Sequence, residues 1–354
     1  MTRQPYSTAN LFMLFLLSYN VLLAVTISYL YWGMWHGTSM GELIGSPWFL
    51  MVNQGIGLLL PLFIFRALCG EYRQMLLRFG SGISCVQQAN TMRPLFIFRF
   101  AYSLKSFGLT NILLVIVLSL LLQPLMMLFS AVASLFLPNP VTGLISELAA
   151  LPLPVALMIV ALTPAICEEL VFRGFIQSKY ESQPIIIAAV VNGLFFGMIH
   201  MNLHQFAYAF AMGIVFAYMV YYTRSVFAGI LAHFVVNATQ YTLGYWTAAQ
   251  ISQPGSEDMA LYAADVWQAI GGLGLISLFT LPATAGLFYI FVKHNRQRNP
   301  IGIVPINVTV TPADITDVDI PYIEAPVEAK SRHPFDMAFW AVVIIFGMLM
   351  VVLM

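Results

Sequence analysis

Two adjacent glutamates and an arginine lie in an otherwise apolar stretch of this chain, at Glu168, Glu169 and Arg173. The run just before them, from Leu151 to Ile166, contains no charged residue, and only 8% of the whole chain is charged. Ionisable groups inside a membrane segment cost free energy, and they therefore mark functional sites. This cluster is the first candidate for chemistry.

Helical spacing gives the three charged residues different roles. Residues four apart lie one above the other on a helix face, so Glu169 and Arg173 are expected to pair. Glu168 is rotated by roughly 100° from Glu169, given about 3.6 residues per turn, and it has no partner nearby in sequence. A carboxylate without a partner can serve as a general base for a water molecule. The alternative is that all three charges form a buried tether between helices.

Two later apolar segments also carry polar pairs with helical spacing. His200 and His204 are four apart, as in the zinc-binding H-E-x-x-H motif, but the glutamate of that motif is absent. We therefore interpret His204 as an interfacial residue. His233 and Asn237 are also four apart and could hold a developing oxyanion; the alternative is an interhelical hydrogen bond. Three such pairs on separate segments favour one convergent site.

The other polar residues of the apolar segments are assigned packing roles. Cys167 adjoins the glutamates, but no histidine lies near it in sequence to activate it as a nucleophile. The intramembrane amides have no ionisable neighbour, and they are Asn20, Asn53, Gln54 and Asn192.

The composition is that of a multi-pass membrane protein. Hydrophobic residues make up 60% of the 354-residue chain, well above the roughly 45–50% that is usual in soluble domains. The formal net charge is zero, which gives no indication of a nucleic-acid partner. We expect an all-α polytopic protein of the cell membrane, because the lipid bilayer cannot satisfy free backbone groups.

A membrane span needs about 20 mainly apolar residues. By that criterion we predict spans at residues 10–34, 47–66, 107–137, 151–178, 184–202, 205–222, 226–246, 266–292 and 336–354. The first is too long for the apolar part of a signal peptide, and no cleavage motif follows it. The third is long enough to be tilted, or broken near Pro124. No internal repeat is visible, which counts against an inverted-repeat transporter.

The positions of Lys and Arg predict the orientation, because short cytoplasmic connectors are enriched in these residues. The connector between the second and third spans carries six basic residues, whereas connectors 35–46, 138–150 and 247–265 carry none: the six are Arg66, Arg73, Arg78, Arg93, Arg99 and Lys105. We therefore expect a cytoplasmic N-terminus and, with nine spans, an external C-terminus.

Two long connectors each have a distinctive composition. Residues 66–106 alternate apolar with basic residues, which predicts a segment lying along the cytoplasmic interface. Residues 299–333 are rich in Pro, Thr, Val and Asp, which predicts a linker of low order. The expected organisation is a multi-span core at 1–293, a cytoplasmic linker at 294–335 and a C-terminal transmembrane helix at 336–354.

The polar pairs form a recognisable series over roughly residues 150–245. The series resembles the pattern of the CPBP family, the CAAX-protease and bacteriocin-processing membrane proteins, also called the Abi family. The motifs, in order, are E-E-x-x-x-R from Glu168, F-x-x-x-H from Phe196 and H-x-x-x-N from His233. The resemblance implies an eight-helix core bundle with a polar cavity open to the cytoplasmic side and the adjacent lipid. The segments after residue 294 are additional to that core.

The resemblance also implies a role for each residue of the site. Glu168 would activate a water molecule with help from His200. His233 and Asn237 would bind the oxyanion, and Glu169 and Arg173 would support the site. The implied mechanism is glutamate-dependent, and no cofactor is expected. If the protein is instead metal-dependent, the zinc ligands would be Glu168, His200 and His233.

The expected function is that of an intramembrane endopeptidase acting near the cytoplasmic membrane face. Its partners would be lipid-modified or membrane-bound substrates, either a prenylated CAAX-type C-terminus or a membrane or leader peptide. One alternative is a non-proteolytic scaffold, such as a bacteriocin-immunity protein, that keeps the fold. Another is a proton-coupled transporter in which Glu168 and the histidines form a relay. The sequence does not indicate the oligomeric state.

Overall fold

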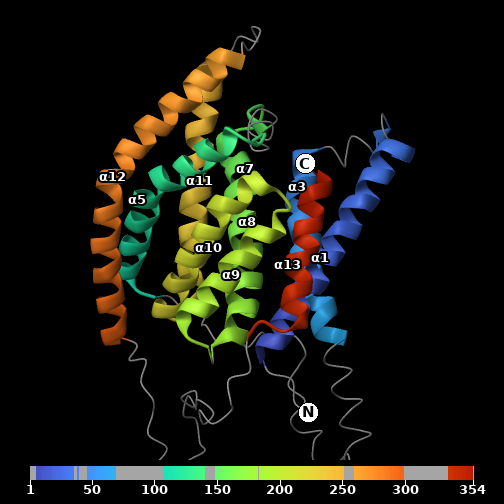
Figure 1. The fold of residues 1–354 in the computed structure, drawn as a ribbon, viewed down its shortest axis with the longest axis horizontal. Coiled ribbons are helices and arrows are strands. Elements are labelled where there is room, and N and C mark those ends of the chain that lie inside the picture. Colours follow the sequence, from blue (N-terminus) through green and yellow to red (C-terminus); the bar gives the residue numbers. More distant parts are fainter. Residues whose placement is uncertain are drawn as a thin grey trace, which may run out of the picture.

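The chain folds into one bundle of long helices, as shown in Figure 1. This computed structural model describes residues 5–35, 38–39, 46–68, 107–139, 148–181, 183–250, 259–298 and 334–353. Within these ranges, each of the nine predicted spans corresponds to a helical run. The prediction of an all-α polytopic membrane protein is confirmed.

The helical runs alternate in direction along the chain, and several contain π-helical segments. The first three runs are α1 Pro5–Tyr29 with the π-helical η1 Leu30–Trp35; α3 Pro47–Gln54 with the π-helical η2 Gly55–Leu59, continuing to Leu68; and α5 Leu109–Ser134. The fourth is one continuous run of α7 Leu153–Leu157, η4 Met158–Leu162, α8 Thr163–Glu169, η5 Leu170–Ile176 and η6 Gln177–Tyr180. The last five are α9 Ile185–Ile199, α10 Leu203–Thr223, α11 Val226–Gln250, α12 Met259–Arg298 and α13 Met337–Leu353.

The lengths of these runs agree with the predicted spans except at a few ends. Seven helices in the described ranges are long and apolar enough to cross a membrane, whereas α9 and α13 are shorter. The helix α5 continues through Pro124 without a break, and α12 extends beyond both predicted ends. The predicted interfacial connector from residue 69 onward and the predicted linker at 299–333 lie outside the described residues.

Two hydrophobic clusters hold the bundle together. One contains side chains of α1, η5, α9 and α13, and the other contains side chains of α5, α10, α11 and α12. The continuous run from α7 to η6, which carries the glutamates, contacts α9 on one side and α11 on the other. The motif-bearing helices therefore pack where the two clusters adjoin.

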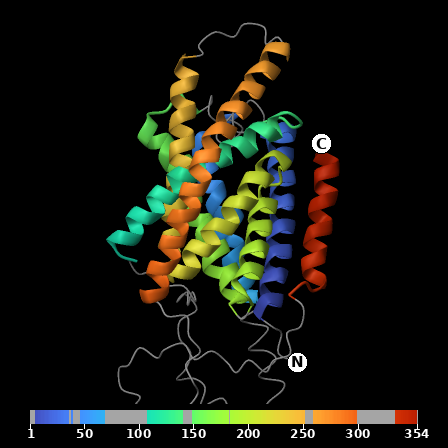
Figure 2. The same cartoon turned by 60° about the vertical axis from the view of Figure 1, so that its left-hand side comes forward.

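The last helix, α13, lies beside α1 in both views of the bundle (Figures 1 and 2). The Phe339 ring packs against Phe195 of α9, with 5.7 Å between the ring centroids. At the start of α13, the Asn10 side chain of α1 donates a hydrogen bond to Asp336 Oδ1 over 2.9 Å. The helix thus contributes to the same core as α1 and α9, while the division into core, linker and added helix stays a prediction.

The helices α9 and α10 approach each other closely because glycines face each other across their contact. A Cβ atom added at Gly213 would lie 2.5 Å from the Cα atom of Gly193. Only a hydrogen atom fits at either position. This contact sets the separation of the two helices, and α9 carries His200 at its end.

We predict that Gly213→Ala destabilises the protein, because the added methyl group must push α10 away from α9. Overpacking of this kind typically costs about 1–3 kcal/mol. Thermal unfolding in detergent should show a lowered midpoint. The matched control is Gly286→Ala in α12, where a Cβ atom meets nothing within 4 Å. An equal midpoint for the two variants would show that the α9–α10 contact is looser than described.

Candidate active site

The motif-bearing run departs from α-helical geometry on both sides of the glutamates. The π-helical segments η4 and η5 flank α8, whose last two residues are Glu168 and Glu169. Such π-helical insertions rotate the side chains that follow them, and they are frequent at functional sites. The predicted pair forms across the junction of α8 and η5, with 2.6 Å between Arg173 Nη1 and Glu169 Oε1.

The Arg173 guanidinium is completely buried and is held from several directions. Besides its bond to Glu169, Nη2 donates to the backbone oxygen of Gly213 in α10 over 3.2 Å. The charged group lies 4.5 Å from the ring centroid of Phe196 and 5.4 Å from that of Phe216. Aromatic faces attract a desolvated cation. The tether interpretation therefore describes Arg173 well, since it links η5 to α10.

His233 of α11 bridges the two glutamates. Its Nδ1 lies 3.0 Å from Glu169 Oε1, and its Nε2 lies 4.0 Å from Glu168 Oε2. An ionised carboxylate only accepts hydrogen bonds, so the bond to Glu169 places a proton on Nδ1. The neutral imidazole then presents Nε2 as an acceptor on the side of Glu168. No spacing in the sequence indicates this bond between separate helices.

The two glutamates therefore differ in their hydrogen-bond partners. Glu169 Oε1 is bonded to both Arg173 and His233, and the residue is fully buried. Glu168 Oε2 has no hydrogen-bond partner among the described residues, and 7% of the residue is exposed. The difference that helical spacing predicted, between a paired and an unpaired glutamate, is present in the structure.

Close backbone packing of α11 makes room for the Glu169 carboxylate. A Cβ atom added at Gly229 would collide with Glu169 Oε2 and lie 3.1 Å from the Val220 side chain. Gly229 is one helical turn before His233, so it lets the backbone of α11 approach the carboxylate while the histidine reaches it. Sequence analysis missed this residue.

His200 and Asn237 enter the site from two other helices. His200 follows α9 directly, and its Nδ1 lies 2.8 Å from the backbone oxygen of Phe196. Asn237 donates one N–H to the backbone oxygen of Val160 over 3.1 Å. This is the interhelical hydrogen bond considered as the alternative, and the second N–H of the amide stays outside it.

His204 takes no part in the site. Its Nε2 lies 3.0 Å from the Ser134 hydroxyl of α5, and the residue is buried. It is buried because α5 covers the start of α10, and its expected position at the membrane interface stays a prediction. A turn at Met201, which has a φ of 47°, separates His200 and His204 into different helices. They do not form the shared helix face that a two-histidine metal site would need.

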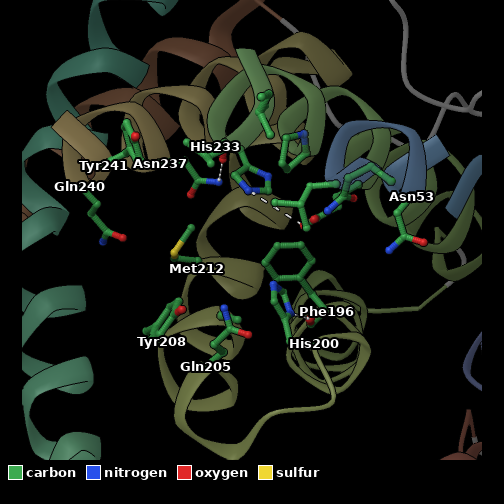
Figure 3. Close-up of a pocket in the computed structure, with 17 residues that line it drawn as sticks. Asn53, Phe196, His200, Gln205, Tyr208, Met212, His233, Asn237, Gln240 and Tyr241 are labelled. Carbon is green, nitrogen blue, oxygen red and sulfur yellow. Dashed lines mark hydrogen bonds and ion pairs between the residues drawn. The ribbon is translucent and has the colours of Figure 1, made fainter. Parts of the chain in front are cut away.

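A cavity of about 260 Å³ brings the predicted residues together. Figure 3 shows His233 and Asn237 on one side and Phe196 and His200 on the other. The cavity is lined by Leu50, Asn53, Gln54, Ile159, Val160, Pro164, Glu168, Phe196, His200, Gln205, Tyr208, Ala209, Met212, His233, Asn237, Gln240 and Tyr241. Glu169 and Arg173 do not line it and lie behind it, which fits the supporting role implied for them.

Several lining residues were missed or misinterpreted from the sequence. Asn53 and Gln54 were taken as packing groups, but both line the cavity. Asn20 and Asn192 do pack, since each donates to a backbone oxygen of a neighbouring helix. The signal for the rest of the wall was a stripe on α10 with helical spacing, formed by Gln205, Tyr208, Ala209 and Met212.

The side chains around the cavity offer few ligands for a metal ion. No group of three His, Cys, Asp or Glu side chains close enough to hold one occurs within the described ranges. The His233 Nδ1 atom is bonded to Glu169, so only Nε2 would remain as a donor. Cys167 is buried and does not line the cavity. The residues proposed as zinc ligands from the sequence thus line one cavity without forming a compact ligand cluster.

Fold and site together define a multi-pass membrane protein with a buried glutamate–histidine cavity. Part of the chain also matches a known protein family. Residues 150–239 match the family described as type II CAAX prenyl endopeptidase Rce1-like. The predicted resemblance to CPBP-type membrane proteases is confirmed over these residues, which make up about a quarter of the chain.

One curated relative also matches part of the chain. It is the "Putative membrane peptidase YdiL" of Bacillus subtilis, 28% identical over 85 residues. The match covers 24% of this chain and 35% of the relative, so the chain aligns with about a third of that protein. No solved structure matches.

We predict that Glu169→Gln strongly destabilises the protein, because it leaves the buried Arg173 charge without its counter-charge. Breaking a buried ion pair on one side typically costs about 3–5 kcal/mol. The double variant Glu169→Gln/Arg173→Met should be less destabilised than the sum of the single variants. Unfolding free energies in mixed micelles provide the test, and additive effects would contradict the pairing.

The control for that experiment is the ion pair of Arg224 with Glu181, at 3.1 Å. The side chain of Arg224 is 34% exposed. Exposed pairs typically contribute about 0–1 kcal/mol, so Glu181→Gln should have a much smaller effect than Glu169→Gln.

A second prediction concerns Gly229. The variant Gly229→Ala should lower proteolytic activity, because the methyl group displaces Glu169 from Arg173 and His233. Gly271→Ala in α12, where a Cβ atom has open space, should retain the parental rate. Rates on a membrane-peptide reporter, with circular dichroism to verify folding, provide the measurement. Equal rates for both variants would show that the position of Glu169 is unimportant.

Proposed function

We propose that the protein is an intramembrane endopeptidase in which Glu168 activates a water molecule for attack on a peptide bond. The observation that carries this proposal is the position of Glu168 in the cavity wall with an unpartnered Oε2, whereas Glu169 lies behind the wall with its Oε1 bonded to Arg173 and His233. A general base must be free to take a proton from its water. Glu168 meets that condition, whereas Glu169 does not.

The geometry supports a specific position for the water. Glu168 Oε2 and His233 Nε2 are 4.0 Å apart, so one water can hydrogen-bond to both at the usual distance of about 2.8 Å. Both atoms are acceptors when His233 is neutral and protonated on Nδ1. The water therefore donates both protons to them, and its lone pairs point toward the substrate. Glu169 contributes by fixing the tautomer of His233.

This arrangement changes the role proposed for His233. An oxyanion must receive hydrogen bonds, and Nε2 of a neutral His233 has no proton to donate. We therefore assign His233 to positioning of the water. The free N–H of Asn237 is the proposed oxyanion donor, because Asn237 lines the same cavity.

The proton then has a path to the leaving group. Glu168 takes it from the water as the new carbon–oxygen bond forms, and delivers it to the amine nitrogen as the peptide bond breaks. His200 lines the opposite wall and presents Nε2, because its Nδ1 is directed to the Phe196 carbonyl. We propose that His200 assists this transfer. The substrates we propose are lipid-modified or membrane-inserted peptides.

We predict that Glu168→Gln lowers the cleavage rate by about 10²–10⁴-fold, the usual contribution of a positioned general base. Its unfolding midpoint should stay close to that of the parent, since Glu168 Oε2 makes no hydrogen bond that is lost. Purified protein in proteoliposomes and a panel of membrane-peptide reporters provide the assay. Glu181→Gln is the matched control and should cleave at the parental rate.

Three outcomes would replace the proposal. Full activity of Glu168→Gln on a substrate that the parent cuts would show that another group is the base. Loss of parental activity on chelation, restored by zinc, would establish a metal-dependent mechanism. Binding of reporters without cleavage by the parent would favour the scaffold alternative.

A further inference from the structure

The basic residues of the chain gather at one face of the bundle, which we call the basic face. In the described ranges, α12 ends there and α9 begins there, and the basic residues near it are Arg66, Lys179, Arg224, Lys293, Arg296 and Arg298. Connectors 69–106 and 299–333 join helix ends at this face and carry further Lys and Arg in the sequence. In Figure 1 it is the lower end of the bundle, where the N-terminus is marked.

At the opposite face, the described helix ends carry no Lys or Arg. The connectors that join helix ends there span residues 36–46, 135–152 and 251–258, and none contains Lys or Arg. Two further basic residues of the chain are Arg3, which lies outside the described residues, and Arg173, which is buried within the bundle. By the positive-inside rule, the basic face is cytoplasmic and the opposite face is external.

The cavity lies on the external side of Glu168. Its walls come from α3, the η4 and α8 segments, the end of α9, the first half of α10 and the part of α11 from His233 to Tyr241. Apart from the middle of α11, these parts lie toward the external ends of their helical runs. Gln240 on α11 is two helical turns from His233 in the external direction, which is about 10 Å. Near the start of α3, the lining residue Leu50 is 37% exposed.

The cytoplasmic side of the site is closed by packed side chains. Beyond the glutamates, every residue from Val171 to Gln177 is buried. Arg173 and Gln177 close this side further, because each donates to a backbone oxygen of α10, at Gly213 and Ala217. About three more helical turns, roughly 18 Å, separate Glu168 from the end of the run at Tyr180.

The short helix α9 is a further difference between the external and the cytoplasmic side of the site. Its 15 residues measure about 22 Å, less than the roughly 30 Å of a bilayer core. The helix starts at the basic face, so its other end, with His200 and the turn to α10, lies within the depth of the membrane. Irregular backbone is tolerated at that depth where it lines a cavity, and this turn does so on the external side.

We infer that the substrate reaches Glu168 from the external face of the membrane. This inference rests on the proposed function, and it names the substrate class: a peptide segment of an exported, lipid-anchored or membrane-inserted protein that is presented at the external side. A prenylated C-terminus held at the cytoplasmic face would have to pass the closed layer between Glu168 and Tyr180. Cleavage near the cytoplasmic face, which was expected from the sequence, therefore does not agree with this route to Glu168.

The test is the side from which the cavity can be labelled. In a chain whose native cysteines Cys69, Cys85 and Cys167 are replaced by alanine, Gln240→Cys puts a thiol in the cavity wall. The matched control Gln297→Cys puts one on an exposed position of α12 at the basic face. Both are treated with a membrane-impermeant maleimide, once in right-side-out cells and once in inverted vesicles.

We expect Gln240→Cys to react in right-side-out cells and Gln297→Cys to react only in inverted vesicles. Reaction of Gln240→Cys from the cytoplasmic side alone, or from neither side while the control reacts, would overturn the inference. Reaction of Gln297→Cys in right-side-out cells would overturn it too, because the basic face would then be external. None of these results depends on catalysis, so they are distinct from a failure of the Glu168→Gln experiment.

Discussion

The burial of the Arg173 guanidinium is the constraint on which the rest of the site depends. Moving a charge into a membrane bundle costs several kcal/mol, and it is tolerated only when the charge is paired and its hydrogen bonds are satisfied. Glu169 supplies the counter-charge, Gly213 supplies a carbonyl, and two aromatic rings cover the remaining faces. These contacts commit Glu169 Oε1, while Glu169 Oε2 is buried without a hydrogen-bond partner and the residue does not line the cavity. A second glutamate is then needed for chemistry, and Glu168 is the adjacent residue, aimed at the cavity.

The packing of the surrounding helices follows from the same constraint. Glu169 can accept from His233 only because Gly229 lets α11 come close, and Arg173 can reach a carbonyl of α10 only because Gly213 faces Gly193 without side chains. The π-helical segments η4 and η5 adjust the register of the motif run on either side of the glutamates. Small residues at helix contacts are common in membrane proteins because they allow close backbone approach. Here that closeness also fixes the tautomer of a histidine.

Much of the fold and part of the candidate site could be predicted from local sequence. The nine helical runs followed from apolar length, and the Glu169–Arg173 pair followed from four-residue spacing. Relations between helices could not be predicted in this way, because no spacing rule connects separate elements. The Glu169–His233 bond, the cavity wall on α10 and the burial of His204 are of this kind. The side on which the cavity lies also needed the structure.

In the proposed mechanism, Glu168 and His233 together hold the water that attacks the substrate. An experimental structure at a resolution that shows ordered water, with an anomalous-scattering scan for zinc, would test it most directly. The account predicts one water within hydrogen-bond distance of both Glu168 Oε2 and His233 Nε2, with Glu169 still bonded to Nδ1 of His233. A zinc ion between Glu168, His200 and His233, or a direct bond from Glu168 to His233 that excludes the water, would contradict it.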